Sequence, residues 1–133
     1  MSASEKIFSQ DHVWLMANQE GDFTLGISDF AQAQLGDIVF AELPAIGAVT
    51  KEGQSCAVIE SVKAASDVIC PISGEVVALN DALNDSPELI NESPYEEGWI
   101  MRIKGDANSL IRGKMTADEY EVYLSKNTEK EAE

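Results

Sequence analysis

The sequence predicts a mainly β domain, an antiparallel sandwich or flattened barrel with a short helix in its N-terminal half and another at its C-terminus. Short runs rich in Val, Ile, Phe and Trp follow one another closely, separated by turns that contain Gly, Pro, Asn or Asp. The chain has 133 residues, enough for one hydrophobic core. Hydrophobic residues make up 44% of it, which excludes wholesale disorder. We therefore predict a single domain over residues 1–133, with its core at about 12–104.

The predicted elements alternate with turn residues along the chain. In order, they are strands at 12–17 and 23–27, a helix at 29–35, strands at 37–43 and 48–52, a hairpin at 57–70, strands at 75–79 and 98–103, and a helix at about 116–126. Ser28 is an N-cap residue for the first helix, and Gly36 is placed to end it in a left-handed conformation. Phe30 of this helix is expected to face inward.

The regions near the C-terminus are predicted from their turn and capping residues. Residues 80–97 contain two prolines and several Asn and Asp residues, so we expect one helical turn there at most. Thr116 and Glu119 have the spacing of a capping box for the last helix. The charged residues 127–133 are expected to fray.

Lys63 is predicted to stand at the tip of the hairpin 57–70. Both arms carry Val and Ile, and small residues surround the lysine. A tip residue has no cross-strand neighbour, so its ammonium group is expected in solvent. Gly47 and Gly74 are expected to frame the hairpin as turn residues that permit positive φ.

The charge of the chain limits its partners. The formal net charge is -15, which makes nucleic acid and anionic membranes unfavourable partners and basic protein surfaces favourable ones. The longest apolar runs are too short to span a bilayer. Between residues 52 and 101 there are ten acidic side chains and one basic side chain, Lys63. The lysine is therefore isolated in an acidic part of the sequence.

The cysteines and the N-terminus indicate the compartment. Residues 1–10 lack the continuous hydrophobic stretch of a signal peptide, so we expect a cytoplasmic protein. Cys56 and Cys70 lie seven residues on either side of Lys63, and the hairpin is expected to bring them onto neighbouring strands. In a reducing compartment we interpret them as two small buried residues rather than as a disulfide or a metal pair.

The surroundings of Lys63 favour modification over catalysis. A catalytic lysine generally needs burial or a neighbouring cation, whereas Glu60 and Asp67 flank this one. In a two-residue turn centred on Lys63 and Ala64, these carboxylates would lie directly opposite each other. They are interpreted either as solvated surface charges or as contacts for a basic partner. Acylation would convert the ammonium group to an amide and make the hairpin a tether for a reactive group.

Several motifs in the correct order resemble those of one known family, the glycine cleavage H proteins, which are lipoyl carriers. The similarity extends over nearly the whole chain. The stretches that carry it are Leu35–Phe40, Leu43–Pro44, Glu60–Asp67, Pro71–Val76, Leu89–Tyr95 and Gly98–Trp99.

The resemblance implies a barrel-sandwich hybrid fold of the lipoyl-domain type, with lipoate in amide linkage on Lys63. It implies a monomeric carrier that is not itself an enzyme. Such a carrier has no catalytic residue and binds no metal. Its partners would be a pyridoxal-phosphate glycine decarboxylase, a tetrahydrofolate-dependent aminomethyltransferase, an FAD-containing dihydrolipoamide dehydrogenase and the enzymes that attach lipoate. The lysine would carry the aminomethyl group of glycine among the first three.

Two positions depart from the family pattern. Val13 stands where the family usually has Glu, and Phe30 stands where it usually has His. In the family that glutamate is thought to help hold the protonated aminomethyl group in a surface cleft, a role that Val13 cannot take. We assign five residues to partner recognition or to the cleft that would receive the lipoyl arm. They are Val13, Phe30, Glu60, Ser61 and Asp67. His12 is interpreted as a packed or capping residue.

Three alternatives stay open. The departures are compatible with a paralogous lipoyl donor or carrier that serves another metabolic system. Biotin carriers share the fold, but they typically place Met on both sides of the lysine, where this chain has Val62 and Ala64. The last alternative is an acidic interaction module whose lysine is never modified.

Overall fold

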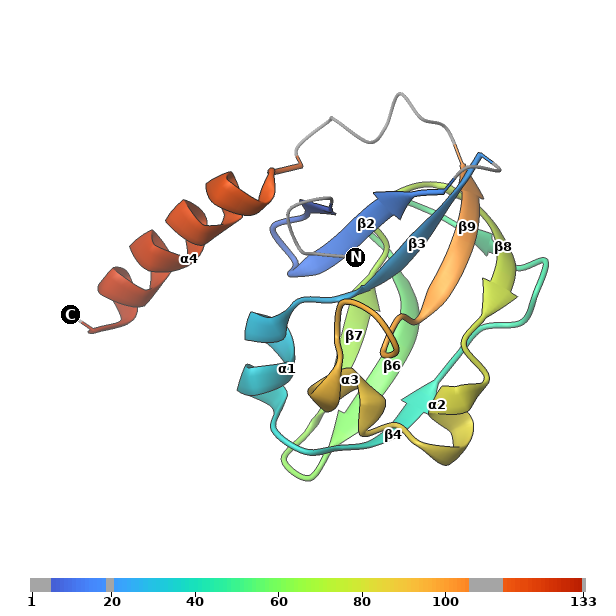
Figure 1. The fold of residues 1–133 in the computed structure, drawn as a ribbon, viewed down its shortest axis with the longest axis horizontal. Helices are drawn as coiled ribbons and strands as arrows, with labels where there is room; N and C mark the ends of the chain where they lie inside the picture. The colour runs from blue at the N-terminus through green and yellow to red at the C-terminus, as the bar shows by residue number, and fades with distance from the viewer. Residues whose placement is uncertain (1–5, 19–20, 106–113, 133) are drawn as a thin grey trace.

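The computed structural model of the protein describes residues 6–18, 21–105 and 114–132. The described strands form two antiparallel sheets that face each other as an open sandwich (Figure 1), which confirms the predicted fold class. The larger sheet has the order β1 (Ile7–Phe8), β2 (Val13–Ala17), β3 (Asp22–Ile27), β9 (Met101–Gly105), β8 (Gly74–Leu79) and β5 (Val49–Thr50). The smaller sheet has the order β4 (Ile38–Glu42), β6 (Ser55–Ser61) and β7 (Ala65–Ile69).

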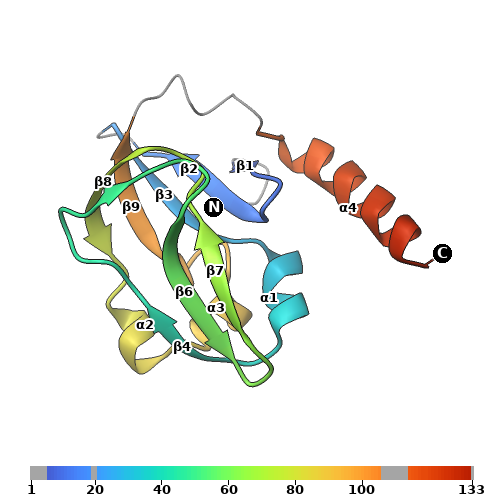
Figure 2. The same cartoon turned by 180° about the vertical axis from the view of Figure 1, so that it is seen from behind.

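The hydrophobic core lies between the two sheets. Leu25 and Ile103 of the larger sheet and Ile59 of the smaller one are almost completely buried in a single cluster. Because side chains alternate along a strand, each sheet turns one face toward this core. The core therefore fixes the β6–β7 hairpin, whose tip lies beside helix α1 (Asp29–Leu35) in both views (Figures 1 and 2).

Helix α1 has the predicted caps. The side chain of Ser28 accepts a hydrogen bond from the N–H of Ala31 at 3.1 Å, and Gly36 ends the helix with a φ of 80°. Ala31 and Leu35 are half-buried and pack against the core. Phe30 is also half-buried.

Residues 80–97 contain two short helices, so the expectation of at most one helical turn was wrong. They are α2 (Ala82–Asp85) and α3 (Leu89–Glu92). Each turn is held by an apolar side chain in the core, Leu83 in α2 and Ile90 in α3. The turn residues of this segment separate the two helices rather than prevent them.

The C-terminal helix α4 (Ala117–Ala132) begins with the predicted capping box. The N–H of Thr116 donates to Glu119 at 2.9 Å, and the N–H of Glu119 donates to Thr116 Oγ1 at 3.2 Å. The helix runs to Ala132, beyond the end predicted at about residue 126. Its last residues are mostly good helix formers, which explains the extension. Neither α4 nor any other described helix is both long and apolar enough to cross a bilayer.

Strand β1 was not predicted, because two residues are too few to show an alternating pattern. Phe8 pairs with Trp14 of β2 and forms an isolated bridge with Met115, just before α4. Its ring stacks on that of Tyr120 with a centroid distance of 4.5 Å. Phe8, Trp14 and Tyr120 form a second buried cluster that joins α4 to the larger sheet.

Candidate functional site

Lys63 lies at the tip of the β6–β7 hairpin and is exposed, as predicted. Ser61 organises the turn, because its Oγ accepts hydrogen bonds from the N–H groups of Lys63 at 3.1 Å and Ala64 at 3.2 Å. The N–H of Val62 donates to the carbonyl of Asp37 at 3.0 Å, which ties the tip to the start of β4. The turn is therefore held from within and from the neighbouring strand.

The register of this hairpin differs from the predicted one. The N–H of Ser61 donates to the carbonyl of Ala64 at 2.8 Å, so the centre of the turn is Val62 and Lys63. Glu60 pairs with Ala65, and Asp67 pairs with Val58. The expectation that Glu60 and Asp67 lie directly opposite each other was therefore wrong. The shift of one residue places each carboxylate opposite an apolar side chain and avoids the like-charge pair.

The side chain of Lys63 lies over the end of α1. Its Nζ is 3.5 Å from the carbonyl oxygen of Gln34. A Cβ on Gly36 would be 3.2 Å from the Cε of the lysine. Glycine at position 36 thus serves twice, because it permits the left-handed helix end and leaves room for the lysine.

A cleft of about 320 Å³ begins at the part of α1 that Lys63 touches. It is bounded by the start of β2, by α1 and by the β6–β7 hairpin, and Gln34 belongs both to its lining and to the contact with Lys63. The lining residues are Asp11, His12, Val13, Ile27, Phe30, Ala31, Gln34, Leu35, Ile59, Ser66, Asp67 and Val68. The exposed wall is about half apolar and half polar, with carboxylates at Asp11 and Asp67.

Three of the five residues assigned from the sequence to recognition or to the arm cleft meet in this cleft. They are Val13 from β2, Phe30 from α1 and Asp67 from β7. Val13 is almost completely buried, whereas Asp67 is exposed and accepts a hydrogen bond from Ser55 Oγ at 2.9 Å. The cleft therefore has a buried apolar floor and a charged edge.

The other two of the five, Glu60 and Ser61, do not line the cleft. Ser61 shapes the turn, as described above, and Glu60 pairs with Phe40 of β4 on the smaller sheet. If Glu60 recognises a partner, the partner would therefore contact it on the surface of the smaller sheet and not inside the cleft.

Two cleft residues, Asp11 and His12, were not assigned to the site from the sequence. His12 Nδ1 is 2.7 Å from the hydroxyl of Tyr120, which is 2.7 Å from Ser28 Oγ. The imidazole also lies against the ring of Phe30, with a centroid distance of 4.9 Å. Asp11 had no alternation signal, because it lies in the turn before β2 and not in the strand. His12 had none, since its side chain is directed by a backbone φ of 67°.

Burial determines the protonation of the His12 imidazole and the Tyr120 phenol. It lowers the pKa of His12 below 6.5, and the nearby Asp11 carboxylate only partly opposes that effect. Burial also raises the pKa of Tyr120 to about 12. At neutral pH the imidazole is therefore neutral and the phenol keeps its proton.

The two glycines predicted to frame the hairpin have different roles. Gly47 has a φ of 91° in a turn, as expected. Gly74 is the first residue of β8 and is not among the residues with positive φ, so the prediction of a left-handed turn there was wrong. A Cβ at Gly74 would collide with the backbone carbonyl of Lys104 in β9. Glycine is needed at position 74 because the two strands approach each other closely.

The two cysteines meet near the other end of the hairpin and are free thiols. The hydrogen bond with Cys70, together with burial, raises the pKa of Cys56. Cys56 Sγ contacts the carbonyl of Val68, and Cys70 Sγ contacts that of Ile72. Among the described residues, no group of three or more His, Cys, Asp and Glu side chains is arranged to hold a metal.

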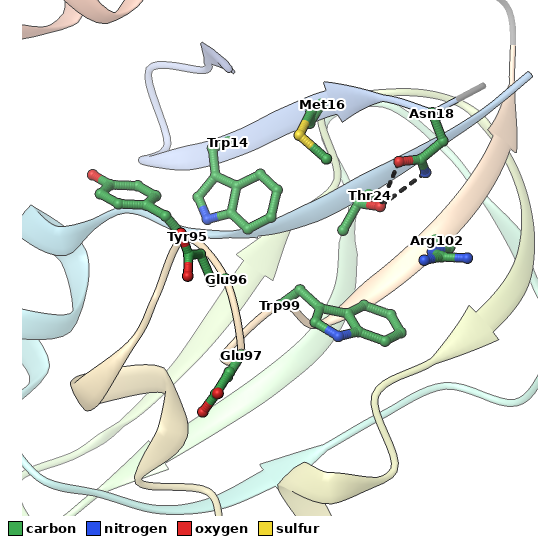
Figure 3. A pocket seen from close by; sticks show the side chains of 9 residues that line it. All are labelled: Trp14, Met16, Asn18, Thr24, Tyr95, Glu96, Glu97, Trp99 and Arg102. Carbon is green, nitrogen blue, oxygen red and sulfur yellow. Dashed lines mark hydrogen bonds between the residues drawn. The ribbon is translucent and has the colours of Figure 1, made fainter. Parts of the chain in front are cut away.

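A second hollow, of about 390 Å³, lies on the larger sheet and shares no lining residue with the cleft (Figure 3). Trp99, Trp14 and Arg102 line it, and the guanidinium of Arg102 lies 5.5 Å from the centre of a Trp99 ring. Trp99 is half-buried and does not line the cleft next to Lys63. The hollow in Figure 3 is therefore separate from the site around the lysine.

The fold and the site together define a carrier domain, a rigid β sandwich that presents one exposed lysine beside a surface cleft. A family model described as Glycine cleavage H-protein matches residues 6–127 of the chain. The chain therefore belongs to the glycine cleavage H-protein family, whose members are carrier components and not catalysts.

Individual relatives agree with this assignment. The chain is 50% identical over 121 residues to the glycine cleavage system H proteins of Salmonella arizonae and Klebsiella pneumoniae, and each alignment covers 91% of this chain and 94% of the relative. The crystal structure of a glycine cleavage system H protein from Mycobacterium marinum matches with a TM-score of 0.83 and 33% identity. That match covers 92% of this chain and 98% of the other.

Proposed function

We propose that Lys63 carries lipoate in amide linkage and that the chain is the lipoyl carrier of glycine cleavage. The observation that carries this proposal is the position of Lys63, exposed on a rigid tip in a chain of the H-protein family. When bound, lipoate supplies a dithiolane that can accept the aminomethyl group of glycine. The protein's own contribution is to hold the attachment point in solvent and to offer the arm a sheltered surface.

The residues around Lys63 are suited to an acylated lysine. The chain of the lysine already lies along the end of α1, with its Nζ next to the Gln34 carbonyl. An amide at this nitrogen keeps one N–H, which can donate to that carbonyl. From there the apolar side chains of the cleft offer a wall for an aliphatic arm, and the carboxylates of Asp11 and Asp67 offer acceptors for an ammonium group.

The partners in this proposal are glycine decarboxylase, aminomethyltransferase, dihydrolipoamide dehydrogenase and the enzymes that attach lipoate. The net charge of -15 favours basic surfaces on these proteins. The proposal also includes a monomeric protein in the cytoplasm, where these enzymes would have access to it.

Mass spectrometry of the protein from lipoate-replete cells tests the attachment. We expect a lipoyl adduct on the tryptic peptide that contains Lys63 and none on Lys51, the neighbouring lysine in the sequence. Lys63→Arg keeps the charge and should abolish the adduct. A protein that stays unmodified in cells that lipoylate their other carriers would contradict the proposal.

The apolar cleft residues also support a second candidate, a paralogous lipoyl carrier for another metabolic system. Val13 and Phe30 offer neither a charge nor a hydrogen bond to an arm that ends in an ammonium group. The two candidates differ in one reaction. Lipoylated protein is mixed with glycine decarboxylase, glycine and labelled bicarbonate, and the carrier of glycine cleavage should support exchange of the label into glycine. Failure of this exchange with fully lipoylated protein would favour the paralogue.

A further inference from the structure

The outer face of the smaller sheet exposes apolar side chains next to Lys63. The exposed fractions are 54% for Val39, 48% for Phe40 and 67% for Val62. These three apolar side chains lie at one end of a small sheet and form a candidate contact surface for another protein.

A β-bulge turns Phe40 outward. In a regular strand Ile38 and Phe40 would lie on the same face, yet Ile38 is buried and Phe40 is not. The register between β4 and β6 shifts between these two residues, so that Val39 and Phe40 are both exposed before Ala41 returns to the core. Bulges of this kind redirect side chains near functional sites. The outward Phe40 is thus built into the backbone and is not an accident of side-chain rotation.

Carboxylates surround this apolar group. Phe40 pairs with Glu60, and Val58 pairs with both Glu42 and Asp67. Directly paired residues share a face of a sheet, so the three carboxylates lie on the same outer face as Phe40. Asp67 belongs to the edge strand β7, where it also borders the cleft. We name this surface, made of Val39, Phe40, Val62, Glu42, Glu60 and Asp67, the tip face.

We propose that the tip face docks the enzyme that attaches the lipoyl group to Lys63, through an apolar seat on that enzyme ringed by Lys or Arg side chains. This inference rests on the proposed function. Because the carboxylates of the tip face are negatively charged, the enzyme that docks there needs basic side chains around its apolar seat. The position of Lys63 selects this partner, because enzymes that act on a loaded arm can reach it at a distance from the tip. The attaching enzyme must instead bring its active site to the bare amine.

The step that this docking serves is an acyl transfer. The Lys63 amine, after losing a proton to solvent or to a base of the enzyme, attacks the carboxyl carbon of lipoate activated as a mixed anhydride with a nucleotide. The N–C bond forms as the bond to the nucleotide breaks, and nucleoside monophosphate leaves. ATP supplies the activation.

The test compares variants of the full, unmodified chain as substrates for an ATP-dependent lipoate ligase. We expect Phe40→Ser to raise the KM for the chain about tenfold with little change in kcat, because Phe40 contributes to docking and not to the chemistry. Val62→Ser, in an exposed turn, should act in the same direction if Phe40→Ser proves unstable. Val49→Ser is the matched control, since Val49 is 77% exposed but lies on β5 of the other sheet.

The outcomes separate this inference from the proposed function. Normal lipoylation of the unaltered chain, with KM values for Phe40→Ser and Val62→Ser within twofold of it, would overturn the docking proposal and leave the carrier function standing. An equal rise in KM for Val49→Ser would also overturn it, because the effect would not belong to the tip face. Absence of lipoylation in the unaltered chain would overturn both.

Discussion

The hydrogen bonds between the Tyr120 hydroxyl and the side chains of His12 and Ser28 connect α4 to the cleft, and Tyr120→Phe removes them without removing the ring. The hydroxyl lies 2.7 Å from both partners. Phenylalanine keeps the stacking on Phe8, so the apolar contribution is largely retained. Each hydrogen bond contributes on the order of 1 kcal/mol, and Ser28 is completely buried and loses a partner that water does not replace. We therefore expect a loss of about 2 kcal/mol in the free energy of unfolding.

Urea denaturation followed by tryptophan fluorescence measures this loss. Tyr95→Phe is the matched control, because the Tyr95 hydroxyl accepts one exposed hydrogen bond, from the N–H of Asp29 at 3.0 Å. It should cost less than about 1 kcal/mol. Imidazole nitrogen shifts provide a second measurement, since Tyr120→Phe removes the partner of His12 Nδ1 and should change the tautomer ratio. A loss below about 0.5 kcal/mol in Tyr120→Phe, or equal losses in both variants, would refute this account of the network.

Four further changes test the site. Lys63→Ala should shift the unfolding free energy by no more than about 0.5 kcal/mol while abolishing lipoylation, and a much lower melting temperature would contradict the exposed tip. Because the folded-state pKa of His12 is lowered, the folded chain binds fewer protons than the unfolded one, so stability should fall from pH 7 to pH 5.5, and less so in His12→Asn. Val13→Glu should slow the spontaneous loss of the aminomethyl group. Because Val13 is buried, the variant should also lose more than about 2 kcal/mol of unfolding free energy in urea denaturation. An unchanged decay rate would mean that position 13 does not contact the loaded arm. Gly36→Ala and Gly47→Ala should each cost about 1–3 kcal/mol through their positive φ, and only Gly36→Ala should shift the NMR signals of the Lys63 side chain.

The sequence predicted those parts of the fold that depend on local chemistry. The cap at Ser28, the capping box at Thr116 and the left-handed Gly36 each follow from one residue type with one strong preference. The tip position of Lys63 followed in the same way, from two β-prone arms around small residues. These features need no knowledge of distant parts of the chain.

The register and the cleft could not be predicted in this way, because they depend on contacts between distant segments. The centre of the turn was displaced by one residue, and with it the partner of Glu60 by two, since the turn is fixed by Ser61 Oγ and by the contact of Val62 with Asp37, a residue that lies outside the hairpin. Regular alternation would place Phe40 on the buried face with Ile38, and the bulge that turns it outward is not visible in the sequence. The place of His12 in the cleft was not predicted, because its partner, Tyr120, lies 108 residues further along the chain.

The cleft has apolar residues at two positions where the family usually has polar ones, but other polar groups lie nearby. Val13 and Phe30 remove a carboxylate and an imidazole from the positions where the resemblance places them, but the structure keeps both kinds of group in the same cleft. Asp11 and Asp67 line it with carboxylates, and His12 lines it with an imidazole that packs against Phe30. Because the imidazole is neutral at neutral pH, it adds no positive charge to oppose an ammonium group. The two departures therefore relocate the polar groups of the cleft rather than eliminate them, so they do not by themselves exclude an aminomethyl cargo.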